Sequence, residues 1–139
     1  MTPGESLIAA ARVYLGAPFV HAGRTATGVD CVGLLIAAAR DAGLADYDYR
    51  NYSRVVNPAV LLGHLQRFLR RLDAPREALL PGDVLLFCPG PQHVALLTAP
   101  WPEPRMIHAW LTLGRVAEHA LDESWQRRLA MALRWRDDG

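Results

Sequence analysis

Residues 15–35 read LGAPFVHAGRTATGVDCVGLL, and this stretch decides how the chain is built around one cysteine. A Gly-rich turn leads to Asp30, which is the expected N-cap of a helix that begins at Cys31. A thiol at the start of a helix lies among unpaired N–H groups and at the positive end of the helix dipole. Such a position lowers a thiol pKa from about 8.5 toward roughly 3.5–7.5. The stretch therefore predicts a reactive thiolate at Cys31.

Helices are expected on both sides of this turn. Residues 2–15 begin with Thr-Pro and a capping-box glutamate and end at Gly-Ala-Pro. Residues 31–43 form the cysteine helix, and residues 57–72 carry leucine and phenylalanine at helical spacing. Residues 45–55 contain three tyrosines without a sustained period. This predicts an ordered loop that either lines a groove or a partner surface or packs its own rings.

The second half of the chain has the pattern of strands. Short apolar runs separated by turn residues occupy 83–88, 93–98, 105–110 and 115–121, and a helical turn at 124–129 precedes a last strand at 129–135. Helices followed by strands predict an α+β fold in which N-terminal helices pack on a C-terminal antiparallel sheet. The length of 139 residues predicts one domain over residues 1–139.

Composition narrows the classes of partner. Fifteen basic and fourteen acidic residues leave a net charge of +1, which gives no electrostatic case for nucleic acid or a membrane surface. The N-terminus lacks a basic segment before its apolar stretch, and no run approaches the roughly 18 apolar residues of a membrane span. The expectation is a chain synthesised in the cytoplasm without a signal peptide and without membrane insertion.

Two histidines are the candidate partners of Cys31. His93 begins one strand-like run and His108 lies in the next. If the two runs form a hairpin, both imidazoles share a face when paired residue numbers sum to an odd value such as 201, and an even sum separates them. On the favourable register one histidine takes the thiol proton and the other orients it. A zinc site of these three residues is the alternative, but no short-range ligand pair joins them, so no metal is expected.

These residues resemble the signature of the NlpC family of papain-like cysteine peptidases. The carriers of the resemblance are LGAPFVHAGRTATGVDCVGLL, LLPGDVLLFC, HVALLT and MIHAW, in this order along nearly the whole chain. The resemblance implies a papain-like fold in which Cys31 is the nucleophile, His93 the general base and His108 the residue that orients it. It implies no cofactor.

Three further residues are candidates for substrate binding: Phe19, His21 and Asp30. Many family members have tyrosine at the position of Phe19. Phenylalanine has no hydroxyl, so the contribution of the tyrosine hydroxyl is either missing or supplied from elsewhere. A helix cap is the favoured explanation of Asp30, and His21 is a candidate because it lies close to the site loop. His64 and His119 are expected to be surface or packing residues, and Cys88 a buried apolar one.

The resemblance implies hydrolysis of a peptide bond in peptidoglycan stem peptides, between D-glutamate and the diamino acid. It is nearest to the short proteins of bacteriophage and gene transfer agent tails. The predicted partners are therefore the stem peptide and tail hub or baseplate proteins, and the predicted place of action is the periplasm or cell wall, reached on a particle tail. The alternatives are a structural tail component with a vestigial site and a related thiol acyltransferase or amidase.

Overall fold

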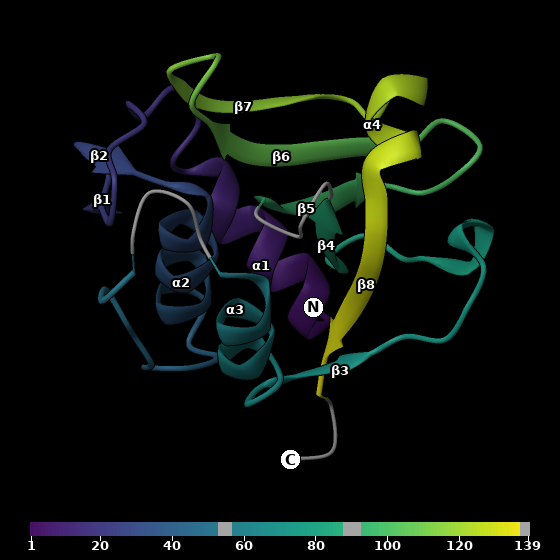
Figure 1. The fold of residues 1–139 in the computed structure, drawn as a ribbon, viewed down its shortest axis with the longest axis horizontal. Coiled ribbons are helices and arrows are strands. Elements are labelled where there is room, and N and C mark those ends of the chain that lie inside the picture. Colours follow the sequence, from purple (N-terminus) through teal and green to yellow (C-terminus); the bar gives the residue numbers. More distant parts are fainter. Residues whose placement is uncertain (53–56, 88–92, 137–139) are drawn as a thin grey trace.

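The computed structural model describes residues 1–52, 57–87 and 93–136. Figure 1 shows three N-terminal helices on one side of a curved sheet, with a short fourth helix before the last strand. The helices are α1 (Pro3–Arg12), α2 (Cys31–Asp41), α3 (Pro58–Leu65) and α4 (Glu123–Arg128), with a 3₁₀ turn at Arg76–Ala78. The strands are β1 (Arg24–Thr25), β2 (Gly28–Val29), β3 (Leu69–Arg71), β4 (Val84–Phe87), β5 (His93–Ala99), β6 (Arg105–Trp110), β7 (Arg115–Ala120) and β8 (Leu129–Trp135).

The main sheet confirms the expected α+β class. Six strands lie in the order β3-β8-β4-β5-β6-β7, and each neighbouring pair is antiparallel. A small hairpin of β1 and β2 stands apart and leads directly into α2. In the described residues no helix is long and apolar enough to cross a membrane.

Local sequence signals fix both ends of the first two helices. Thr2 and Glu5 form a reciprocal capping box at the start of α1. The helix ends at Arg12, three residues before the expected Leu15, and the chain turns through Gly16 with a positive φ of 85°. Helix α2 begins at Cys31, as expected.

The third helix is shorter than predicted. The helical spacing of residues 57–72 continues only to Leu65, and Leu69–Arg71 instead form the edge strand β3 against β8. Leu69 is fully buried there, and the Phe68 ring stacks on Trp135 at a centroid distance of 5.9 Å. The expected helix over 66–72 was wrong because pairing with a strand sixty residues later satisfies the same backbone groups and buries the same apolar side chains.

The sheet has an apolar core on each face. On the helix side, α1 and α2 pack against alternate residues of the strands, including Leu86, Val94 and Ile107. On the other face, Leu97 and Met106 are among the buried residues, and Trp125 of α4 packs against this second cluster. Both faces are buried at the centre of the sheet, which explains why β4 and residues 94–97 of β5 are apolar at every position.

Candidate active site

Cys31 is the first residue of α2 and a free, buried thiol. It belongs to the same apolar cluster as Val94, whose backbone N–H lies close enough to lower the pKa of the thiol. The structure thus brings Cys31 to the start of β5, at the residue that follows His93.

The electrostatic environment of this thiol differs from the expectation. Burial is the largest effect and raises the pKa of Cys31 to about 11, with a further upward contribution from the charge of Asp30. Backbone N–H groups of Val94, Val32 and Cys31 itself lower the pKa by less. The predicted depression of the pKa was therefore wrong, because desolvation of a thiolate in the apolar core outweighs the donors at the helix start. The resting site holds a protonated thiol at neutral pH.

Asp30 organises the loop in front of the cysteine. One carboxylate oxygen accepts the Gly33 N–H at 2.7 Å, which makes Asp30 the N-cap of α2. The other accepts the Ala22 N–H at 2.7 Å and the Tyr52 hydroxyl at 2.6 Å. Ala22 has a positive φ of 58°, which is unfavourable for a residue with a side chain, so the carboxylate holds the turn in a strained conformation. Both oxygens of Asp30 are engaged in positioning the loop and helix.

Gly33 permits the close approach of this loop to α2. A Cβ at this position would lie 2.0 Å from the carbonyl oxygen of Gly23 and 2.8 Å from the Arg24 guanidinium. Only glycine fits without displacing the backbone.

Arg24 is a buried cation that sequence reasoning did not identify. It is 3% exposed, and its guanidinium donates to the Gly23 carbonyl, to the Asp48 carboxylate at 2.8 Å and to the Tyr49 carbonyl at 2.7 Å. It also lies 3.4 Å from Asp30. Arg24 thereby ties the loop that carries the tyrosines to the turn that precedes Cys31, a link between segments that only the folded chain reveals.

The strand register brings the two candidate histidines together. Leu96 pairs with Ile107 and Leu97 with Met106, so paired numbers sum to 203. The sum is odd, as the same-face condition requires. It is larger by two than the example of 201, so His93 is not directly opposite His108. His93 and His108 are therefore diagonal neighbours, with 2.6 Å between His93 Nε2 and His108 Nδ1.

Both imidazoles are enclosed by aromatic rings. His93 is 4% exposed and His108 is fully buried, and the Trp125 ring of α4 lies 5.5 Å from the first and 5.2 Å from the second. Trp110 contacts His93 edge-on at 4.5 Å. Burial lowers the pKa of His108 to about 3 and that of His93 well below its ordinary value. Both rings are neutral at pH 7. They contact Trp125 on the face of the sheet opposite the helix-side cluster that contains Cys31, so transfer of the thiol proton to His93 stays a prediction.

A third histidine extends this pair. His119 Nε2 lies 2.7 Å from His108 Nε2, and its Nδ1 lies 2.8 Å from the Ala120 carbonyl oxygen. The expected surface or packing role for His119 was incomplete. Met106 pairs with His119, so paired numbers in β6 and β7 have an odd sum and His119 shares a face with His108. The sequence alone offered no means to choose that sum.

The other two substrate-binding candidates lie on the loop before Asp30. Phe19 is half-buried against the helix-side core, and its N–H donates to the Gly114 carbonyl at 2.9 Å. His21 is half-buried, with its Nε2 3.2 Å from the Tyr52 carbonyl oxygen. Contact of either residue with a substrate stays a prediction.

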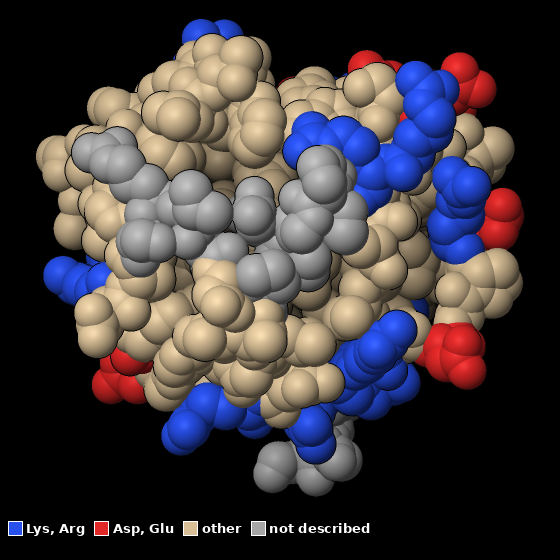
Figure 2. Space-filling view, viewed as in Figure 1, with Lys and Arg blue, Asp and Glu red and all other residues tan. Residues whose placement is uncertain are grey.

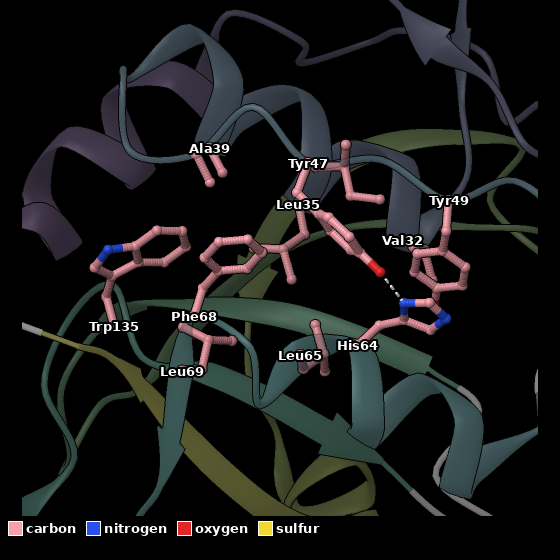
Figure 3. A pocket seen from close by; sticks show the side chains of 12 residues that line it. Val32, Leu35, Ala39, Tyr47, Tyr49, His64, Leu65, Phe68, Leu69 and Trp135 are labelled. Carbon is pink, nitrogen blue, oxygen red and sulfur yellow. Dashed lines mark hydrogen bonds between the residues drawn. The ribbon is translucent and has the colours of Figure 1, made fainter.

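Two of the three loop tyrosines line a small pocket beside α2. Figure 3 shows the Tyr47 hydroxyl directed at His64 Nδ1 and the Tyr49 ring lying against the His64 ring. The Tyr49 and His64 rings stack with centroids 3.6 Å apart, and the cavity between these groups and α2 has a volume of about 40 Å³. His64 is thus a packing residue, as one expectation held.

Tyr49 carries an unusual hydroxyl. This group is buried and finds no hydrogen-bond partner among the described residues. Burial raises the pKa of Tyr49, and the negative charge of a thiolate at Cys31 is the next largest cause. The hydroxyl therefore remains a protonated donor within the electrostatic neighbourhood of the cysteine.

Charge is unevenly distributed around the molecule. On the face shown in Figure 2, arginine side chains gather at the upper right and along the lower edge, and the surface between them is mostly uncharged.

No group of three or more His, Cys, Asp or Glu within residues 1–52, 57–87 and 93–136 is arranged to hold a metal ion. Cys88, expected to be a buried apolar residue, lies outside the described residues.

A family profile and several solved structures match the chain. The sequence profile described as the NlpC/P60 family matches residues 16–134. No curated protein sequence matches the chain.

Solved structures share the fold at low sequence identity. An NLP/P60-family protein of Staphylococcus aureus, described as similar to a lipoprotein, superposes with a TM-score of 0.69 at 22% identity, over 98% of this chain and 42% of that one. The NlpC/p60 domain of the peptidoglycan hydrolase SagA gives 0.62 at 22% identity, over 94% of this chain and 97% of that one. An NlpC/P60 family protein from Bacillus cereus gives 0.71 at 23% identity, over 95% and 40%. The chain thus spans less than half the length of the staphylococcal and Bacillus proteins.

Proposed function

The chain belongs to the NlpC/P60 family, and from this premise we propose that it is a cysteine peptidase that cuts the stem peptides of peptidoglycan, with residues 1–139 acting as one catalytic domain. The observation that carries the proposal is the meeting of a buried thiol at a helix start with the first residues of β5, where His93 begins a hydrogen-bonded pair with His108. The hydrolase SagA, which shares the fold, supports peptidoglycan as the substrate class.

The proposed reaction has two steps. The Cys31 sulfur attacks the peptide carbonyl carbon while its proton passes to His93, and the C–N bond then breaks as His93 protonates the leaving amine. In the second step His93 removes a proton from water, which attacks the thioester carbon and releases the acid and the free thiol. Backbone N–H groups at the start of α2 hold the oxyanion in both steps.

The neutral resting state is compatible with this chemistry. With the pKa of Cys31 raised and that of His93 lowered, the proton stays on sulfur until a substrate occupies the site. Attack and proton transfer then occur together, and the buried imidazole accepts the proton as charge develops on the substrate oxygen. His108, hydrogen-bonded to His93, orients the ring.

The hydroxyl that Phe19 lacks has a candidate substitute. The Tyr49 hydroxyl is a buried donor that no described residue satisfies, and it lies close enough to Cys31 for a thiolate there to raise its pKa. In the proposal this hydroxyl donates to a carbonyl of the bound stem peptide. The free carboxylates of such peptides also suit a face on which arginines gather at the upper right and along the lower edge (Figure 2).

Digestion of purified sacculi tests the proposal. Wild type should release muropeptide fragments identifiable by mass spectrometry, and Cys31→Ala should release none while keeping the thermal stability of wild type. Equal products from both proteins, or none from either, would favour a structural component with a vestigial site. Failure on stem peptides combined with formation of a thioester from another acyl donor would favour an acyltransferase or amidase.

We also propose that a phage-like or gene transfer agent tail carries the enzyme to the cell wall, bound to hub or baseplate proteins. The support is the resemblance of residues 115–135, RVAEHALDESWQRRLAMALRW, to the end of the short tail-borne members of the family. Co-purification with intact particles would support this role. Recovery only as a free secreted monomer would contradict it.

A further inference from the structure

We propose that His119 is a positioning residue that sets the direction of a chain of three imidazoles, so that His93 keeps an unprotonated nitrogen for Cys31. The consequence for catalysis rests on the proposed function, whereas the proton arrangement is a property of the free protein. This chain of imidazoles runs across β5, β6 and β7 through His93, His108 and His119.

The direction follows from the last contact in the chain. His119 Nδ1 faces the Ala120 carbonyl oxygen at 2.8 Å, and a carbonyl oxygen can only accept, so Nδ1 carries the proton. In the neutral ring His119 Nε2 is then an acceptor. His108 Nε2, 2.7 Å away, must donate to it, which leaves His108 Nδ1 as an acceptor.

The same reasoning applies to the contact between His108 and His93. His108 Nδ1 accepts from His93 Nε2 at 2.6 Å, so His93 carries its proton on Nε2 and its Nδ1 is free of hydrogen. A neutral imidazole has one donor and one acceptor nitrogen, so each ring fixes the next. Because Nε2 of His93 is occupied by His108, Nδ1 is the nitrogen that can receive the thiol proton.

Without the anchor at Ala120 the chain could run the other way. The reversed arrangement has His119 donating to His108 and His108 donating to His93, which places the His93 proton on Nδ1. Both arrangements satisfy the two imidazole contacts equally, and among the contacts of the described residues the Ala120 carbonyl distinguishes them. A reversed chain leaves His93 with no base for the sulfur.

The surroundings keep the first two rings neutral and the chain intact. His108 is fully buried, and Trp125 lies within 5.5 Å of both His93 and His108. Among the described residues, the charged and titratable groups that act on His93 are His108, His119 and Arg128 of α4, and the charge of Arg128 opposes protonation of His93. His119 is the one that acts on His108. Glu118, the neighbour of His119 on β7, is engaged with Arg12 instead.

The test combines histidine NMR with kinetics on three variants. Two-bond ¹H–¹⁵N correlations report which nitrogen of His93 carries the proton, and wild type should show Nε2–H. His119→Gln replaces the accepting nitrogen with an amide oxygen, so it should keep that tautomer and retain most of the sacculus-digesting rate.

His119→Ala removes the acceptor and the anchor together. A mixture of His93 tautomers is expected, with a loss of rate of order 10- to 100-fold, the range found when the outer partners of metal-bound imidazoles are removed. Glu118→Gln on the same strand is the matched control and should leave the tautomer unchanged.

An Nδ1–H tautomer of His93 in wild type, or an unchanged Nε2–H tautomer in His119→Ala, would overturn the proposal. So would equal rate losses in the Gln and Ala variants. If wild type does not digest sacculi, the proposed function fails, and the NMR result still decides the role of His119 on its own.

Discussion

Tyr49 and Tyr52 lie three residues apart, and the same change at each should alter stability in opposite directions. The Tyr49 hydroxyl is buried without a hydrogen-bond partner among the described residues, whereas the Tyr52 hydroxyl donates to the Asp30 carboxylate at 2.6 Å. Replacing either by phenylalanine removes one oxygen and keeps the ring. The Tyr49 ring retains its stacking on His64.

The magnitudes follow from the hydrogen-bond inventory. A buried polar group without a partner costs about 1–3 kcal/mol, so Tyr49→Phe should raise the free energy of unfolding by about 1–2 kcal/mol once the small void is subtracted. A hydrogen bond to a charged group is worth about 1.5–3 kcal/mol, so Tyr52→Phe should lower it by about that amount. Effects of the substitution on the unfolded chain are alike at the two sites and cancel in the comparison.

Urea denaturation of the two variants and wild type at pH 7 measures both values, and sacculus digestion supplies the functional readout. Tyr49→Phe should be more stable than wild type and also slower on stem peptides, because the proposed donor to the substrate is lost. A Tyr49→Phe variant destabilised as much as Tyr52→Phe would refute the reasoning, since it would mean that the Tyr49 hydroxyl is satisfied in the free protein.

Three further predictions concern the same site. Gly33→Ala should destabilise the protein by about 1–3 kcal/mol in urea melts and lower activity, because its Cβ would lie 2.0 Å from the Gly23 carbonyl oxygen; wild-type stability would contradict this packing. In a Cys88→Ser background, alkylation of native Cys31 by iodoacetamide should rise about tenfold per pH unit from 7 to 10, since burial raises its pKa to about 11, and a plateau below pH 8 would show an ionised thiol instead. Burial lowers the pKa of His108 to about 3, so its folded form stays neutral while the unfolded chain takes up a proton, and stability should fall by several kcal/mol as pH drops from about 6.5 toward 3. His108→Gln should flatten that slope, and an equal slope in both proteins would assign acid unfolding to other groups.

Much of the fold could be read from local patterns. The capping box at Thr2, the cap at Asp30 and the alternation of apolar runs with turns place α1, α2 and the last five strands within a few residues of their observed bounds. These signals act between residues close in sequence, so they can be recognised without knowledge of the rest of the chain. The same patterns failed at Leu69–Arg71, where β8 supplied a pairing partner that no local signal announces.

The sequence by itself determined that a cysteine begins a helix and that histidines lie on strands later in the chain. Only the tertiary structure decided that an odd register aligns His93 with His108, that His119 continues the pair, and that Arg24 ties the tyrosine loop to the turn before Cys31. It also reversed the expected direction of the thiol pKa. The physical reason is that register and desolvation arise from groups far apart in sequence, whose cost or benefit exists only once the chain has enclosed them.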